Sequence, residues 1–164
     1  MEENNIVLEQ KLSDKEKYEQ LSKVVESLID KNDNLISNLA NFSALLKQNF
    51  NKISWVGFYI YDGNKLYLGP FQGKVACTQI AIGNGVCGTA AEKRETIIVL
   101  NVDKFPGHIA CDANSKSEIV VPIFNKDNSL FGVLDLDSES YYSFNEEDKF
   151  YLEQYCSFIS KEIL

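Results

Sequence analysis

The chain has 164 residues, which is the length of one domain of ordinary size. With 45% hydrophobic and 24% charged residues, its composition is that of a globular protein and excludes disordered, collagen-like and disulfide-dense classes. The net charge of −8 opposes phosphate backbones and anionic lipid, so we expect neither nucleic acid nor a membrane as a partner.

The N-terminus and the absence of a long apolar segment favour a cytoplasmic protein. No segment approaches the roughly 18 apolar residues of a spanning helix, and residues 1–5 are acidic where a signal peptide would be basic. Four cysteines in a reducing compartment are not expected to form permanent disulfides, which leaves metal binding, catalysis, redox cycling or packing. We expect a single domain over residues 1–164, with a flexible N-terminus at 1–13.

Hydrophobic periodicity predicts an α+β fold with a central, mostly antiparallel six-stranded sheet between N-terminal and C-terminal helices. Apolar residues at helical spacing predict two scaffold helices within 14–50, the first beginning with a capping box at Ser13 and Glu16. The pattern then changes to the period of two that is typical of strands, and residues 101–116 form a long loop. The predicted strands are 55–60, 66–68, 78–82, 96–100, 118–124 and 130–136, with helices at 86–94 and after Asn145.

A Gly-x-Gly-x-x-Gly pattern at residues 83–88 superficially matches a dinucleotide-binding fingerprint. We reject that interpretation, because the helix that follows is too short for a crossover and hairpins surround it. Glycines before a helix N-terminus still present free N–H groups at Gly85 and Val86, which suit a carboxylate or phosphate and lower the pKa of a nearby thiol.

Three cysteines, Cys77, Cys87 and Cys111, lie in predicted loops or at the ends of elements, whereas Cys156 lies in an amphipathic helix and is expected to pack. One alternative is a zinc site made of these three thiols and His108, but the nine residues between Cys77 and Cys87 are wrong for a zinc knuckle. Thiol redox chemistry without a metal fits better: one thiol attacks, another resolves and the third passes the disulfide onward.

Two acidic residues, Asp135 and Asp137, interrupt an apolar strand and share one face because side chains alternate along a strand. Such a pair is costly unless it binds a cation or shares a proton, although a solvated face of an edge strand would also explain it. Glu118 is a third candidate acid. Trp55 and Tyr59 share a face by the same rule, either as core residues or as an aromatic wall.

The three segments that carry the loop cysteines read GPFQGKVAC at 69–77, GVCGTAA at 85–91 and PGHIACD at 106–112, the last followed by SEIVVP at 117–122. In this order they resemble the free methionine-(R)-sulfoxide reductases, a family of stand-alone GAF-domain enzymes, over residues 15–162. Small-molecule-sensing GAF domains generally lack these cysteines. The resemblance implies a GAF-like fold and reduction of the R epimer of free methionine sulfoxide.

The resemblance also assigns roles to the thiols. Cys111 would attack the sulfoxide sulfur and become a sulfenic acid, and Cys77 or Cys87 would then condense with it to a disulfide. Thioredoxin would reduce that disulfide, drawing on NADPH indirectly through thioredoxin reductase, and no cofactor would be bound.

The same resemblance assigns the binding site. The acids Glu118, Asp135 and Asp137 would donate a proton to the sulfoxide oxygen and hold the substrate ammonium. An aromatic box around the S-methyl end, and N–H groups for the substrate carboxylate, would complete it; these are Trp55, Tyr59, Gly85 and Val86. GAF domains often pair through terminal helices, which leaves a homodimer open. The competing interpretation is a GAF module that binds a small molecule without turnover.

Overall fold

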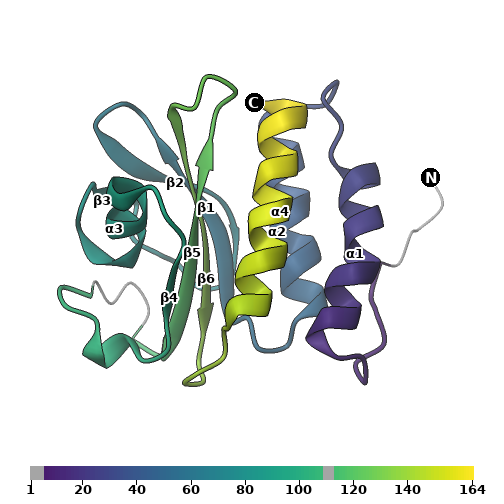
Figure 1. Ribbon diagram of the computed structural model, residues 1–164, viewed down its shortest axis with the longest axis horizontal. Helices are drawn as coiled ribbons and strands as arrows, with labels where there is room; N and C mark the ends of the chain where they lie inside the picture. Colours follow the sequence, from purple (N-terminus) through teal and green to yellow (C-terminus); the bar gives the residue numbers. More distant parts are fainter. Residues whose placement is uncertain (1–5, 109–112) are drawn as a thin grey trace.

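A computed structural model describes residues 6–108 and 113–164 of the chain (Figure 1). Its elements follow the predicted order along the sequence. The helices are α1 (Asp14–Leu28), α2 (Leu35–Asn49), α3 (Gly85–Lys93), α4 (Glu146–Ile163) and a 3₁₀ turn, η1 (Val102–Lys104). The strands are β1 (Trp55–Tyr61), β2 (Lys65–Gln72), β3 (Gln79–Ala81), β4 (Ile97–Val99), β5 (Ser117–Phe124) and β6 (Leu130–Ser138).

Within the described residues the strands form one six-stranded sheet in the order β3-β2-β1-β6-β5-β4. Every neighbouring pair is antiparallel, so the predicted α+β fold with a mostly antiparallel sheet is confirmed. β6 lies between β1 and β5 and is therefore a central strand. At Gly132, β6 approaches β1 so closely that a Cβ there would lie 2.1 Å from the carbonyl oxygen of Tyr59.

The two faces of the sheet are covered differently. Helices α2 and α4 pack on one face with α1 outside them, while α3 lies over the opposite face (Figure 1). The helical side holds the larger core, to which the strands contribute alternate residues such as Val56, Phe58, Leu134 and Leu136. A smaller apolar cluster under α3 includes Trp55, Tyr59 and Cys87, and the polar site lies beside it.

The helix α1 is tied to α4 by a partly buried ionic network. Ser13 caps α1 with the predicted capping box, and the Tyr18 hydroxyl donates to Asp148 Oδ1 at 2.8 Å. Lys52 Nζ lies 2.6 Å from a carboxylate oxygen of both Asp14 and Asp148. Because Asp148 is buried, this network supplies the donors that its carboxylate needs.

The bounds of three strands, β2, β3 and β4, differ from the prediction. β2 extends beyond the predicted 66–68 because pairing with β1 continues past a register shift, whereas β3 and β4 are shorter. The predicted loop 101–116 contains η1. Ile6 and Leu8 pack against the core, and the flexibility expected for 1–13 stays a prediction. Among the described residues, no helix is both long and apolar enough to cross a membrane.

Candidate active site

The site is built on the sheet face under α3, where strand alternation places the predicted acids. Across three neighbouring strands, Asp137 of β6 lies opposite Trp55 of β1 on one side and Glu118 of β5 on the other. Asp135 occupies the next position of β6 on the same face, two residues earlier. The three predicted acids therefore do meet, and they do so in the middle of the sheet.

The central position of β6 shows that the alternative of a solvated edge strand is wrong. Glu118 and Asp135 are each only 6% exposed. Two carboxyl groups that are this buried cannot be explained as a water-facing surface, because burial of a carboxylate is costly without a proton or a cation. Glu118 and Asp135 must therefore be stabilised either by bound protons or by a nearby cation.

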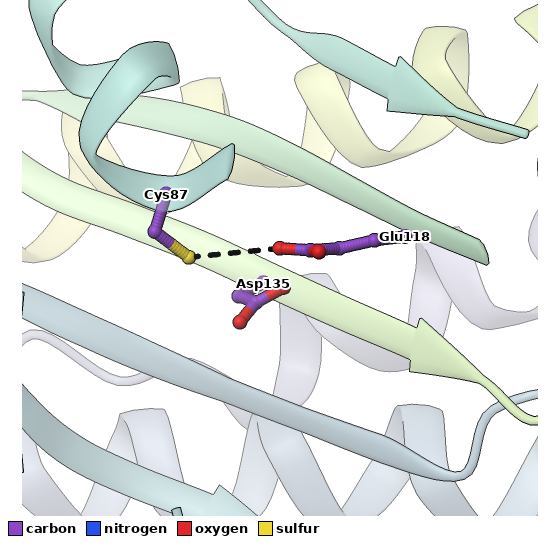
Figure 2. A group of neighbouring side chains, drawn as sticks. All are labelled: Cys87, Glu118 and Asp135. Carbon is purple, nitrogen blue, oxygen red and sulfur yellow. Dashed lines mark hydrogen bonds between the residues drawn. The ribbon is translucent and has the colours of Figure 1, made fainter. Parts of the chain in front are cut away.

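The helix α3 brings a thiol into the acid cluster. Cys87 Sγ donates a long hydrogen bond to Glu118 Oε1 at 4.0 Å (Figure 2). One potential ligand atom each of Cys87, Glu118 and Asp135 lies within 4.8 Å of the other two, and all three residues are buried. Over the part of the chain that the structure describes, Asp135 Oδ1 is the buried side-chain oxygen or nitrogen without a hydrogen-bond partner.

Burial and mutual repulsion control the protonation of this cluster. Burial raises the pKa of Glu118 well above its ordinary value, and the neighbouring Asp137 raises it further. The pKa of Asp135 is raised by burial, then by Asp137 and Glu118. The Cys87 thiol has a raised pKa for the same reasons, burial first and then Asp135 and Glu118. Each of these three groups therefore keeps its proton to a higher pH than it would in water.

A small cavity of about 30 Å³ opens onto these groups. The described lining residues are Tyr59, Ile80, Asn84, Gly85, Val86, Cys87, His108, Ser115, Glu118, Asp135 and Asp137.

The N-terminus of α3 borders this cavity at the predicted Gly85 and Val86. Its N-cap residue Asn84 makes no side-chain capping bond, so the first N–H groups of the helix keep their capacity to donate. Gly83 and Gly85 have positive φ angles of 82° and 60°. A Cβ at Gly88 would lie 2.3 Å from the Ala81 carbonyl oxygen. Backbone geometry thus explains why glycine occupies these three positions, without a bound dinucleotide.

The aromatic residues lie beside the acids. The Tyr59 hydroxyl donates to the Cys77 carbonyl oxygen at 3.0 Å, and its ring lines the cavity. Trp55 stacks on Tyr59 with ring centroids 6.0 Å apart and on Phe71 at 5.4 Å. Its indole N–H donates to the Lys74 carbonyl oxygen at 3.0 Å. Trp55 does not line this small cavity and contacts it only through its stacking on Tyr59.

The cysteines differ in state. Cys77 is disulfide-bonded, whereas Cys87 and Cys156 are free and buried. Cys156 lies in the helical core, as predicted. Cys111 lies outside the described residues. A disulfide-bonded Cys77 cannot ligate zinc. Among the described residues, the side chains close enough together to hold a metal ion are Cys87, Glu118 and Asp135 rather than three thiols and His108.

Two polar residues of the site lie outside the strand pattern and were not predicted as part of this acid cluster. Ser115 Oγ donates to Asp137 Oδ1 at 2.5 Å. His108 Nε2 lies 3.6 Å from Glu118 Oε2, with 15% of its side chain exposed. Both belong to the long loop before β5, where no periodicity indicates which way a side chain points. The sequence suggested His108 as a zinc ligand and not as a neighbour of Glu118.

The antiparallel sheet, with helices on one face and a short helix over an acidic site on the other, defines a GAF domain, and the model of that family matches residues 35–163. The chain is 52% identical to GAF domain-containing protein A of Dictyostelium discoideum, covering 87% of this chain and 89% of that protein. It is 47% identical to the free methionine-R-sulfoxide reductase of Saccharomyces cerevisiae, covering 92% and 87%.

The same likeness extends to solved structures. The free methionine-R-sulfoxide reductase of Neisseria meningitidis, solved in complex with its substrate, superposes with a TM-score of 0.88 at 42% identity, covering 95% of this chain and 93% of that one. The chain therefore belongs to the free methionine-R-sulfoxide reductase family of GAF-domain proteins.

Proposed function

We propose that this protein is an oxidoreductase that reduces free methionine-(R)-sulfoxide to methionine. The observation that carries the proposal is the convergence of the buried Glu118 and Asp135 with Asp137 on one small cavity. Buried carboxyl groups need protons or a cation, and a substrate with an ammonium group and a basic sulfoxide oxygen provides a use for both forms. The substrate named for the Saccharomyces cerevisiae relative has these groups.

Each end of the substrate has a complementary group. An ionised carboxylate of the cluster holds the ammonium, and a protonated one donates to the sulfoxide oxygen. The N–H groups of Gly85 and Val86 donate hydrogen bonds to the substrate carboxylate at the start of α3. Tyr59, supported by Trp55, contacts the S-methyl end. A methionine sulfoxide inside a peptide has an uncharged amide in place of the ammonium, so it leaves the buried acids unpaired and is excluded.

The chemistry needs only thiols. The Cys111 thiolate attacks the sulfoxide sulfur, the oxygen takes one proton from the acid cluster, and methionine leaves Cys111 as a sulfenic acid. A second thiol then attacks that sulfur, which forms a disulfide and releases water. The balance is two thiols and one sulfoxide consumed for one methionine, one disulfide and one water formed.

Cys77 fits the role of the second thiol better than Cys87. Cys77 is the cysteine that is disulfide-bonded, whereas the Cys87 thiol is buried among acids that raise its pKa and suppress the nucleophilic thiolate. In this proposal Cys87 stays reduced through the cycle. Thioredoxin reduces the disulfide with electrons from NADPH through thioredoxin reductase, and no cofactor is bound. The cytoplasmic location and a homodimer remain predictions.

Thiol titration tests the proposal and separates it from a non-catalytic GAF sensor. The reduced protein is mixed with each epimer of free methionine sulfoxide, and free thiols and methionine are counted. We expect two thiols lost per methionine formed with the R epimer and none with the S epimer. Binding of the R epimer without thiol loss would favour the sensor.

A further inference from the structure

Cys87, Glu118 and Asp135 form a buried cluster of potential metal ligands. They project from α3, β5 and β6 toward one point, with ligand atoms within 4.8 Å of one another (Figure 2). Asp135 is only 6% exposed, and its Oδ1 atom is fully buried without a hydrogen-bond partner among the described residues. This oxygen is an acceptor that a cation would satisfy.

The chemistry of the donors selects the cation. Mg²⁺ and Ca²⁺ prefer oxygen ligands alone, whereas a thiolate beside two carboxylate oxygens suits the softer Zn²⁺. In tetrahedral Zn²⁺ coordination, neighbouring sulfur and oxygen ligands lie about 3.6 Å apart. The widest separation in the cluster would have to shrink by about 1 Å on that geometry. Small side-chain rotations supply such a change, because each of the three groups ends a rotatable side chain.

We propose that the substrate-free site binds one Zn²⁺ through Cys87, Glu118 and Asp135, and that the ion excludes the amino-acid substrate. His108 Nε2 is 3.6 Å from Glu118 Oε2 but lies outside the group of mutually close ligand atoms, so its side chain would have to move toward the other donors to become the fourth ligand. Binding releases the thiol proton and the carboxyl protons to solvent and changes no oxidation state. The competition with substrate rests on the proposed function, whereas the metal binding does not.

The ion in this proposal is an inhibitor and not a cofactor. Zn²⁺ on Glu118 and Asp135 occupies the carboxyl groups that would hold the ammonium and protonate the sulfoxide oxygen. Its ligand set also differs from a site of three thiols and His108, because its one thiol is that of Cys87 and Cys77 takes no part in it. Zinc would therefore block the enzyme in the form that is ready for substrate.

The binding test uses the full chain with Cys77→Ser and Cys111→Ser, so that this pair cannot chelate metal. Calorimetric titration with Zn²⁺ should give one ion per chain, and Co²⁺ should give a thiolate-to-metal charge-transfer band in the near ultraviolet. Adding Cys87→Ser should remove the band and weaken Zn²⁺ binding more than about tenfold. Even the loss of a residue that only contacts a metal ligand typically costs about tenfold in affinity. Adding Cys156→Ser, the matched buried thiol, should change neither.

A second variant protects the test against misfolding. Asp135→Asn should keep the charge-transfer band, since Cys87 remains, while weakening Kd more than about tenfold. Fewer than one ion per chain, or a band that persists in the Cys87→Ser protein, would overturn the proposed site. Free methionine-(R)-sulfoxide should raise the apparent Kd for Zn²⁺ in proportion to its concentration. Turnover without zinc binding defeats this inference alone, and zinc binding without turnover defeats the proposed function alone.

Discussion

Replacement of Glu118 by Gln tests the acid cluster most directly. The amide keeps the size and hydrogen-bonding shape of the side chain beside Cys87 and His108 but can neither ionise nor deliver an acidic proton. Loss of a general acid costs about 100-fold or more in rate, which corresponds to about 2.7 kcal/mol of transition-state stabilisation. We therefore expect kcat/KM for free methionine-(R)-sulfoxide to fall about 100-fold or more, with a raised KM because one ammonium partner is lost.

Although kcat/KM of Glu118→Gln should fall, the thermal stability of this variant should not. Because burial and Asp137 raise the folded-state pKa of Glu118, the folded protein binds this proton more tightly than the unfolded chain does. The stability that this group contributes is full below its ordinary pKa of 4.5 and is lost as pH rises toward the folded pKa. Glu118→Gln removes that loss, so its thermal midpoint at neutral pH should equal or exceed that of the parent protein.

The assay compares initial rates and thermal midpoints of the parent, Glu118→Gln and the control Glu162→Gln, whose carboxylate is exposed near the end of α4. The control should match the parent in both. An unchanged kcat/KM in Glu118→Gln would refute the assignment of Glu118 to the site. A collapsed midpoint at neutral pH would instead identify Glu118 as a structural partner, contrary to the repulsion described above.

The remaining predictions concern the thiols, the ionic network and metal removal. Cys111→Ser should abolish turnover while Cys156→Ser leaves it nearly intact, and equal loss in both would indicate a structural role for the thiols. Lys52→Met should lower the free energy of unfolding in urea by about 3 kcal/mol, because it strips a counter-charge from the buried Asp148; the exposed control Lys161→Met should change it by less than about 0.5 kcal/mol. Treatment with a chelator should leave kcat/KM undiminished, and activity that is lost and then restored by zinc would contradict metal-free chemistry.

The alternation of side chains made part of the site predictable. It placed Asp135 and Asp137 on one face and Trp55 with Tyr59 on one face without knowledge of the fold. It could not show that β6 lies between β1 and β5, which is what brings Glu118 next to Asp137, because strand order depends on contacts far apart in the sequence.

Other parts of the site depend on tertiary packing alone. Cys87 meets the acids only because α3 folds across the sheet, and its spacing along the chain carries no sign of that contact. His108 and Ser115 reach the cluster from a loop, where backbone direction changes from residue to residue and no period applies. The capping box at Ser13, in contrast, is local and was predictable from four residues.

The close approach of β6 to β1 at Gly132 has a consequence for how this chain avoids misfolding. A slip of β6 by one residue would turn Asp135 and Asp137 into the helical core and Leu134 and Leu136 toward the polar site under α3. The same slip would bring a residue with a Cβ to the place where one would lie 2.1 Å from the Tyr59 carbonyl oxygen. The absence of a side chain at Gly132 thus favours one register between β6 and β1 by steric exclusion of the shifted one. That register keeps the acids out of the apolar core.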